Sequence, residues 1–380
     1  MNLFRSLQPK KVRIGVYIST KAIHNIYIKQ EYKFTVRELV RANNGLNNTE
    51  LFFFSRKDIN LVELTINGVY FDIQSEKWRR KEYSYPDVLY SRTREINNNV
   101  NMKLRESLIK NGVYFLNARS AFDKWNVYQE LLKDEEVSKY LPITMLYNHP
   151  TDLRKMFAYN HSVYIKPRVG RLGNSIIHVR MVPGQGYEYK YFSGRLVYRK
   201  VKTYNELTKV IRRILRNKKA IMQSAINSIK VNNNRMTDMR AEIQRTGNGK
   251  LKVIDIFSRI GAENSPITNL PSGAEFFRFD PFIRSYLNYS EEEADLLKQK
   301  IEVFLRKFHE SIERIYGSLG ETAIDFALDS NQQLWFIECN STSTKLAYLV
   351  AKSPQQTIRS AFINPLEYCI YLHKQENRIF

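Results

Sequence analysis

The chain has 380 residues, a length that suits two or three domains, and its 43% hydrophobic and 13% aromatic content excludes an intrinsically disordered protein. Lysine and arginine number 60 against 38 acidic residues, so the formal charge is +22. That charge favours anionic partners such as nucleotides, nucleic acid or acidic polymers without choosing among them, and a merely solvated cationic surface is the alternative.

The sequence contains two cysteines, Cys339 and Cys369. Two cysteines exclude a disulfide framework and disfavour a cysteine-based zinc site, which indicates a reducing compartment. No apolar segment of signal-peptide length follows the basic residues of 1–11, and no run of about 18 apolar residues occurs. The sequence therefore predicts a cytoplasmic location, with neither a secretory signal nor a membrane span.

Residues 1–118 alternate short apolar runs with helical patterns. Strands are predicted at 12–18, 51–54, 88–91 and 113–117, and helices at 34–42 and 100–111. Strands separated by helices are typical of a small α/β layer with a mostly parallel sheet. We therefore predict an N-terminal α/β domain over residues 1–118.

Residues 119–226 form the second predicted unit. A helix is expected at 123–132, strands near 163–165, 175–180, 187–192 and 195–200, and a second helix at 204–215. Apolar residues of that second helix, from Leu207 to Leu215, recur with the period of an amphipathic helix.

Residues 227–380 form the third predicted unit. Strands at 237–245 and 250–258 flank a Thr-Gly-Asn-Gly turn, and strands at 322–329 and 334–340 form a second hairpin. Ser290 with Glu293 three residues later is a capping-box signal for a long helix that ends near residue 316. The remaining tail is predicted to be mostly helical.

The second hairpin carries three oxygen ligands. If residues 330–333 form a loop in a regular register, Asp325 lies opposite Glu338, and Asn340 shares a face with Glu338 because side chains alternate along a strand. Hard oxygen ligands of this kind suit Mg²⁺ that is also bound to substrate phosphates. A surface edge strand with solvated acids is the alternative. Cys339 points to the other face, where core packing is expected.

A glycine-containing loop follows a predicted strand that ends in Lys166. The loop includes Arg168, Gly170 and Gly173, so its backbone can approach phosphate oxygens while Lys166 supplies a positive charge. No G-K-[ST] sequence occurs and no helix follows, which excludes a Walker loop. A basic hairpin loop without a ligand is the alternative.

A third group of polar residues lies on the strand at 237–245. Alternation places Asp238, Arg240 and Glu242 on one face, from which Arg240 could contact a transferring phosphate, although a solvated face explains the pattern equally well. Arg259 and Asn269 follow in a stretch rich in loops, where binding residues are common.

Taken in order, these motifs resemble the ATP-grasp superfamily, and within it the YheC/YheD group of endospore coat-associated proteins. The segments that carry the resemblance are 123–125, 165–167, 222–226, 238–240, Arg259 with 268–269, Asp325 and 334–340. They span roughly residues 110–345. The resemblance implies an α/β (α+β) protein, with an ATP-grasp fold behind an N-terminal α/β pre-domain. The loop after Asn340 reads Ser-Thr-Ser-Thr, where many members have a proline.

The resemblance also implies roles for individual residues. Lys124 and Lys166 would contact the nucleotide phosphates, and the loop 168–174 would close over them. The segment from Gln223 through Ser224 to Ile226 would bind adenine through its backbone groups, beside an apolar wall formed by Met222. Asn269 would also contact the nucleotide. Asp325, Glu338 and Asn340 would hold one or two Mg²⁺ ions. Arg240 and Arg259 would stabilise charge on the transferred phosphoryl group.

The function implied by the resemblance is that of an ATP- and Mg²⁺-dependent ligase. A substrate carboxylate would attack the γ-phosphate to give an acyl phosphate, and an amine or thiol would then displace phosphate. The substrates could be acidic, and spore-coat components are implied partners. Two alternatives stay open: a non-catalytic structural protein of the coat, and a basic protein that binds polyanions or, less expectedly, nucleic acid.

Overall fold

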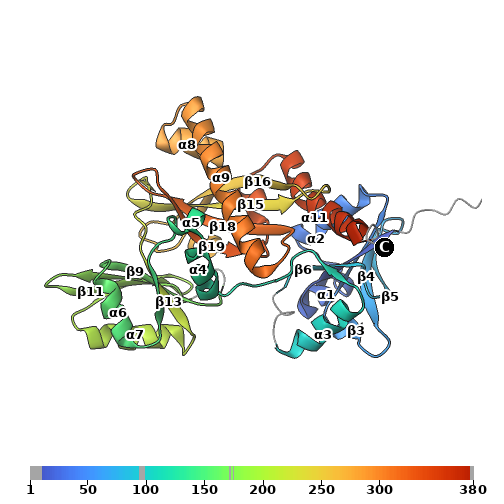
Figure 1. Ribbon diagram of the computed structural model, residues 1–380, viewed down its shortest axis with the longest axis horizontal. Helices are drawn as coiled ribbons and strands as arrows, with labels where there is room; N and C mark the ends of the chain where they lie inside the picture. The colour runs from blue at the N-terminus through green and yellow to red at the C-terminus, as the bar shows by residue number, and fades with distance from the viewer. Residues whose placement is uncertain (1–10, 94–98, 171–172, 174, 377–380) are drawn as a thin grey trace, which may run out of the picture.

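The computed structural model describes residues 11–93, 99–170, 173 and 175–376, and Figure 1 shows three sheets within them. The first sheet is built from residues 12–115, the second from 144–224 and the third from 230–340. Among the described residues, no helix combines the length and apolar character that crossing a bilayer requires.

The first sheet has the predicted parallel core. Strands β1 (Val12–Tyr17), β2 (Thr49–Phe54), β6 (Val88–Ser91) and β7 (Tyr114–Phe115) pair in parallel in the order β2-β1-β6-β7. Helices α2 (Phe34–Asn44) and α3 (Asn99–Lys110) are confirmed near their predicted bounds, and α1 (Thr20–Tyr27) was not predicted.

An antiparallel hairpin extends the first sheet and was missed by the sequence analysis. Strand β4 (Thr65–Asp72) pairs with β2, with β5 (Lys77–Ser84) and with the short β3 (Ile59–Asn60), which follows a turn of 3-10 helix, η1 (Arg56–Asp58). Trp78 and Tyr83 alone are buried on β5, and charged residues separate them. The strand therefore lacks the alternation that would have revealed it.

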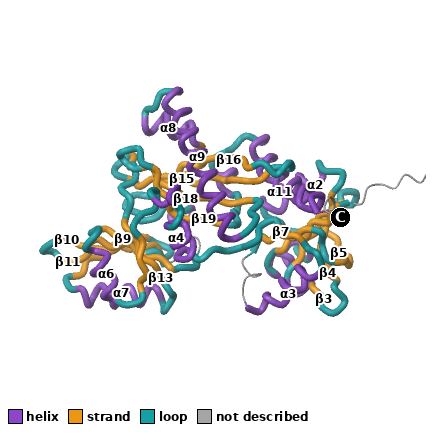
Figure 2. Tube along the Cα trace, viewed as in Figure 1, coloured by secondary structure: helices purple, strands orange, loops and turns teal. Residues whose placement is uncertain are grey.

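The second sheet is antiparallel, with helices on one face only (Figure 2). Its order is β12-β11-β10-β9-β13-β8, with β8 (Thr144–Tyr147), β9 (Ser162–Pro167), β10 (Ile177–Val182), β11 (Gly186–Phe192), β12 (Leu196–Val201) and β13 (Ala220–Ser224). Helices α6 (Pro150–Phe157) and the predicted α7 (Tyr204–Leu215) bury their apolar residues against Ile165, Ile177 and Val179. The opposite face is left for the site.

The third sheet has the order β17-β16-β15-β18-β19. Its strands are β15 (Arg235–Arg245), β16 (Leu251–Ile260), β17 (Glu275–Arg278), β18 (Glu321–Leu328) and β19 (Leu334–Asn340), and β14 (Lys230–Val231) pairs with β15. Helix α9 (Glu291–Tyr316) packs on one face and starts at the predicted capping box of Ser290 and Glu293. Helix α8 (Phe279–Leu287) packs beside it.

The register of the last hairpin was predicted correctly at the site and wrongly near the turn. Asp325 pairs with Glu338, as expected, but Phe326 pairs with Phe336 and Leu328 with Leu334. The extra residue is Ile337, which forms a bulge. The turn is also tighter than assumed, because Asp329 accepts hydrogen bonds from the backbone of Asn331 and Gln333.

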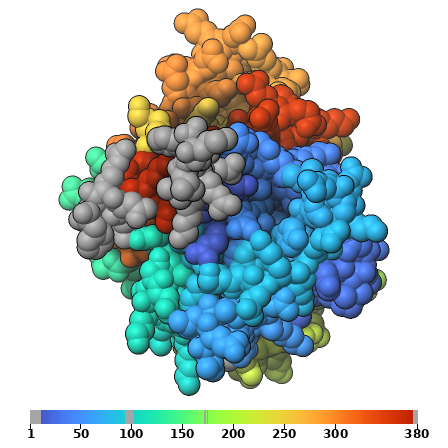
Figure 3. Space-filling model, turned by 90° about the vertical axis from the view of Figure 1, so that its right-hand side faces the viewer, coloured from blue at the N-terminus to red at the C-terminus, as the bar shows by residue number. Residues whose placement is uncertain are grey.

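Two helical segments pack across the proposed domain boundaries at 118 and 226. Helices α4 (Lys124–Leu132) and α5 (Glu135–Ser138) join the core beneath α9 rather than the second sheet. Helices α10 (Leu346–Val350) and α11 (Gln355–Glu376) share a core with β1 and α2. Figure 3, which views the molecule from the right-hand side of Figure 1, shows orange-red C-terminal segments next to the blue N-terminal domain. The three-domain division with these boundaries remains our proposal.

Candidate functional site

A cavity of about 480 Å³ lies between the open face of the second sheet and the third sheet. Most sequence-predicted site residues line it: Lys166, Gly173, Gln223, Ser224, Ile226, Arg240, Arg259, Asn269, Asp325 and Glu338. Lys124 and Asn340 lie next to it, in a small hollow that shares Glu338 with the cavity. The cavity and the adjoining hollow therefore bring together residues that are up to more than 200 positions apart in the sequence.

Strand register explains why the charged residues of the third sheet meet. Arg240 on β15 pairs with Asp325 on β18, which pairs with Glu338 on β19. Two positions along β15, Asp238 pairs with Arg259 on β16. Directly paired residues point to the same face of a sheet, so both rows face the cleft.

Asp325 is the centre of a buried ion cluster. Arg240 donates two hydrogen bonds of 2.7 Å to its carboxylate, and Nη1 of Arg259 lies 3.5 Å from Oδ1. Burial disfavours the charge of Arg240, but Asp325 outweighs this effect and raises the pKa of Arg240 above its ordinary value. The arginine therefore stays protonated at any physiological pH.

Asp238 and Thr268 orient Arg259. Arg259 donates to the two oxygens of Asp238 at 2.6 and 2.7 Å, and Thr268 Oγ1 donates to Oδ2 at 2.5 Å. Burial raises the pKa of Asp238, although the charge of Arg259 opposes the rise. Asp238 was predicted to share a strand face with Arg240, but neither Asp238 nor Thr268 was given a role, since an orienting contact is visible only in three dimensions.

Glu338 lies between two lysines. Lys124 Nζ is 3.1 Å from Oε2, and Asn340 Nδ2 donates to Oε1 at 3.2 Å. Burial alone would raise the pKa of Glu338, but the charges of Lys124 and Lys166 outweigh it and hold the pKa below the ordinary range. Glu338 is therefore a carboxylate at neutral pH.

Lys166 is as deeply buried as Arg259, with 5% of the surface of each exposed. Its Nζ donates to Gln223 Oε1 at 2.7 Å and to the carbonyl of Ile337 at 3.4 Å. Burial lowers the pKa of Lys166 to about 8, with Glu338 opposing the shift and Lys124 adding to it. Lys166 thus titrates close to physiological pH, unlike an exposed lysine.

The segment after β13 has a backbone donor available for a ligand. Ser224 and Ala225 donate their backbone N–H groups to the carbonyls of Ile143 and Ser162. Ile226, which lines the cleft, has no such partner among the described residues. The expectation for Met222 was wrong. Its side chain is fully buried in the core of the second sheet, on the face opposite to Gln223, so it forms no wall of the cleft.

The glycine loop is only partly described, because Arg171, Leu172 and Asn174 lie outside the described residues. Arg168 was expected to contact the nucleotide, but it does not line the cavity. Its guanidinium donates to Asp123 at 3.0 and 3.1 Å, which ties the loop to the start of α4. Gly170 lies at the same junction, where its carbonyl accepts from Lys124 Nζ at 3.4 Å, and it does not line the cavity.

The oxygen ligands fit Mg²⁺ bound with a nucleotide better than a protein-only metal centre. Within the described ranges, no three His, Cys, Asp or Glu side chains are grouped to hold a metal by themselves. Asp325 and Glu338 nevertheless face each other, and each carboxylate oxygen can accept more than one bond, so their ion pairs leave lone pairs for a cation. Two carboxylates with an amide oxygen match the few protein ligands that Mg²⁺ takes beside phosphates.

Comparison with known proteins agrees with this geometry. The model of a protein family described as "YheC/D like ATP-grasp" matches residues 112–372. The chain belongs to this ATP-grasp family. A curated relative, the endospore coat-associated protein YheD of Bacillus subtilis (strain 168), is 25% identical over 303 residues, or 76% of this chain. The chain spans 63% of the length of that relative.

Solved structures of two ligases share the fold. The D-alanine–D-alanine ligase of Bacillus anthracis matches with a TM-score of 0.56 and 13% identity, covering 96% of this chain and 99% of that chain. The VanG D-Ala:D-Ser ligase of Enterococcus faecalis matches with a TM-score of 0.55 and 12% identity, covering 96% and 100%. At such identities the likeness shows the fold alone.

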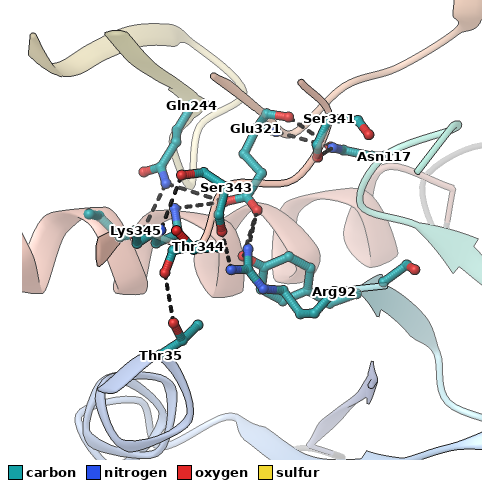
Figure 4. A network of polar contacts seen from close by, with 12 residues as sticks. Thr35, Arg92, Asn117, Gln244, Glu321, Ser341, Ser343, Thr344 and Lys345 are labelled. Atoms are coloured by element: carbon teal, nitrogen blue, oxygen red, sulfur yellow. Dashed lines mark hydrogen bonds and ion pairs between the residues drawn. The ribbon is translucent and has the colours of Figure 1, made fainter. Parts of the chain in front are cut away.

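In this ATP-grasp chain a buried polar network supports the loop that follows Asn340 (Figure 4). Ser343 and Thr344 line the cleft, while Lys345 is 0% exposed and its Nζ lies 2.8 Å from Glu321 Oε2 and 4.0 Å from Glu242 Oε2. Arg92 from the N-terminal domain bonds to Glu321 at 2.7 Å and to the carbonyl of Ser343. No sequence pattern indicated this network, because a lysine in a loop is normally exposed.

Proposed function

We propose that the protein is a Mg²⁺- and ATP-dependent ligase that joins a carboxylate to an amine or a thiol through an acyl phosphate. One observation carries the proposal: a single cleft gathers Lys166, Arg240, Arg259, Asp325 and Glu338 between two sheets. The ligases among the solved structures with this fold support the reaction class.

The nucleotide would lie along the cleft with adenine at the segment after β13. Ile226 offers its backbone N–H there, and Ile176, Met236 and Ile337 provide apolar surfaces for the ring. Lys166 would then lie at the phosphates, because it is held beside Glu338 and the bulge at Ile337. Lys124 would contact the same phosphates from the start of α4.

The residues of the chain position the substrates and neutralise the charge that develops on the phosphoryl group. They form no covalent bond with it. A carboxylate oxygen of the substrate would attack the γ-phosphorus, and the bond to the bridging oxygen would break with departure of ADP. Arg240 and Arg259 are fixed by Asp325 and Asp238, so they meet the developing charge on the phosphoryl oxygens without reorganising. Attack of an amine or thiol on the acyl carbon would then release phosphate.

Asp325, Glu338 and Asn340 would hold the metal. When bound, Mg²⁺ would neutralise the negative charge of the phosphates. The side chains would orient the triphosphate along β18 and β19, since both carboxylates are fixed by ion pairs to Arg240 and Lys124. A protein-held carboxylate that is ionised at neutral pH is what such a site requires, and the low pKa of Glu338 meets that requirement.

We also propose a connection with the spore coat, based on the name of the curated relative. A protein that binds ATP without turnover would fit that name too. The cytoplasmic location stays a prediction.

The proposal is tested first by calorimetric titration of ATP, with and without Mg²⁺, into the wild type and Lys166→Ala. Binding that depends on Mg²⁺ and is lost in the variant would support the site. ADP release is then followed with pools of amino acids and peptides as acids and amines. Absence of ATP binding to the wild type contradicts the proposal, whereas binding without ADP release from any pool favours the non-catalytic coat protein.

Proton uptake should accompany ATP binding above pH 8. The pKa of Lys166 is about 8 in the free protein, so much of it is neutral there, and a nearby phosphate favours the ammonium form. Binding should therefore raise this pKa and weaken as pH rises through and beyond 8. Calorimetry in two buffers of different ionisation enthalpy measures the uptake. Lys166→Arg keeps the positive charge but does not titrate in this range, so it should still bind ATP without the buffer dependence. Persistence of the full uptake in that variant would assign it to another group.

Gly173→Ala should lower ATP affinity about tenfold, because overpacking costs ~1–3 kcal/mol. Gly173 has φ +68°, and an added Cβ would lie 2.7 Å from Asn269 Nδ2 and 2.9 Å from Ile267 Cδ1, two residues of the cleft wall. Gly194→Ala is the matched control, since Gly194 has φ +69° and no neighbour within 4 Å of such a Cβ. Equal losses in the two variants would point to backbone strain alone.

A further inference from the structure

The positive charge of the protein is concentrated in one segment. Residues 177–219 contain twelve lysines and arginines but two acids, Glu188 and Glu206. This segment of strands β10 to β12 and helix α7 thus carries +10 of the net +22. Helix α7 packs on the face of the second sheet opposite to the open one, so this charge is divided between the two faces of that sheet.

A trough of about 650 Å³ lies on the open face of these strands. Strand register builds its floor as a row that crosses the second sheet: Tyr164 pairs with His178, His178 with Lys190, and Lys190 with Tyr198. The far wall comes from the third unit, with Lys230, Asn234 and Asn264. The row therefore leads from the nucleotide cleft, which Tyr164 lines, to the edge strand β12.

The trough and the cleft are continuous. A hollow of about 350 Å³ between them shares Lys190 and Lys230 with the trough, and Ile226 and Met236 with the cleft. A ligand in the trough would thus lie beside the nucleotide end of the site, while the phosphate and metal residues lie further inside.

Cations in the trough outnumber carboxylates. Glu188 is held by both Arg180 and Lys200, at 2.6 and 3.0 Å. Lys190 and Lys230 have no carboxylate within ion-pair distance among the described residues, and Lys190 Nζ lies over the ring of Tyr198 at 5.3 Å. Burial lowers the pKa of His178 to about 4, and Lys190, Arg180 and Lys230 contribute to the shift, so His178 adds no charge of its own.

The edge of the second sheet adds a feature that a simple cationic surface lacks. Strand β12 is the outermost strand, so its outer backbone groups face away from the sheet. Along it, Leu196 and Tyr198 are 36% and 40% exposed and point to the open face. Arg195, Val197 and Arg199 point to the other face, where they border a second hollow of about 410 Å³. An extended peptide can pair with such an edge, with its side chains entering pockets on either face.

We infer that the trough and the β12 edge form a docking site for an acidic peptide segment in extended conformation. On the open face of the sheet, peptide carboxylates would meet Lys190 and Lys230. The alternate, apolar side chains would point to the other face and enter the hollow beside Val197. Nucleic acid is the less suitable ligand, because it would use the cations but leave the backbone edge and the hollow beside Val197 without partners. The site does not depend on the proposed ligase activity.

Fluorescence anisotropy with a labelled short peptide of alternating glutamate and valine tests the inference. The double variant Lys190→Glu/Lys230→Glu should lower the affinity about tenfold or more, since each reversal replaces attraction by repulsion. The matched control Lys21→Glu/Lys110→Glu makes the same change of net charge at exposed lysines of the N-terminal domain and should bind like the wild type. ATP binding checks that each variant is folded, and Lys190→Gln/Lys230→Gln is a milder second variant.

Two further probes distinguish the alternatives. The same peptide with alternate backbone nitrogens methylated should bind much more weakly, because it cannot pair along β12. An oligonucleotide of equal charge should compete poorly. The inference is overturned if no peptide binds, if the control variant loses as much affinity as the trough variant, if methylation has no effect, or if the oligonucleotide displaces the peptide efficiently.

Discussion

Glu338→Gln is expected to abolish ATP turnover, with ADP release falling roughly 1,000-fold, the scale on which one preorganised charged group acts in a transition state. Glu338 is a half-buried carboxylate held between Lys124 and Lys166, and glutamine keeps its shape without its charge. ATP itself should still bind, since both lysines remain. The dependence of that binding on Mg²⁺ should disappear, which calorimetry measures in the same variant.

Glu310→Gln provides the comparison, because Glu310 is an exposed acid on α9 away from the cleft. It should leave turnover and Mg²⁺ dependence unchanged. Wild-type turnover by Glu338→Gln would refute the metal assignment, and loss of ATP binding in that variant would mean that the carboxylate acts mainly by holding the lysines in place. A thermal unfolding curve confirms that the variant is folded before either result is interpreted.

Lys345→Met should lower the free energy of unfolding by ~3–5 kcal/mol, the cost of leaving a buried charge without its partner. Lys345 is completely buried, and its ammonium is the cation nearest to Glu321 Oε2, at 2.8 Å. Burial raises the pKa of Glu242 in the folded state, and Lys345 opposes that rise. Denaturant unfolding at neutral pH measures the loss.

Lys352→Met is a closely matched control. Lys345 and Lys352 both have positive φ, 57° and 51°, but Lys352 is exposed. The control variant should lose less than ~1 kcal/mol, as is usual for surface substitutions. The pH dependence adds a second check. Without Lys345 the pKa of Glu242 should rise further, so the variant should recover part of its stability as the pH falls and Glu242 is protonated in the folded state. No recovery would argue against the charge as the cause.

Much of the fold was accessible from sequence because the pattern and the packing agree. Helix α9 begins at a capping box and keeps one apolar stripe throughout, and strands β18 and β19 were found with nearly correct bounds. The opposition of Asp325 and Glu338 was also predicted, although from a regular register that the bulge at Ile337 contradicts. Agreement at the site came from two compensating errors, the turn length and the missing bulge.

The rest depends on contacts between distant segments. Arg168 looked like a phosphate ligand because it lies in a glycine loop, but Asp123 is 45 positions away and binds it. Met222 lies next to a cleft residue, and only the sheet face decides that its side chain is in the core. The trough on the second sheet combines two proposed domains, so no local pattern could indicate it.

The position of α11 has a consequence for how the chain is made. Ile358, Phe362 and Leu366 of this helix cover β1 of the N-terminal domain, although synthesis makes β1 first and α11 more than 330 residues later. The growing chain must therefore keep an apolar face of its earliest sheet uncovered until residues 355–376 emerge. A ribosome-bound intermediate truncated before α11 should be a chaperone client, with an aggregation tendency that the finished protein lacks.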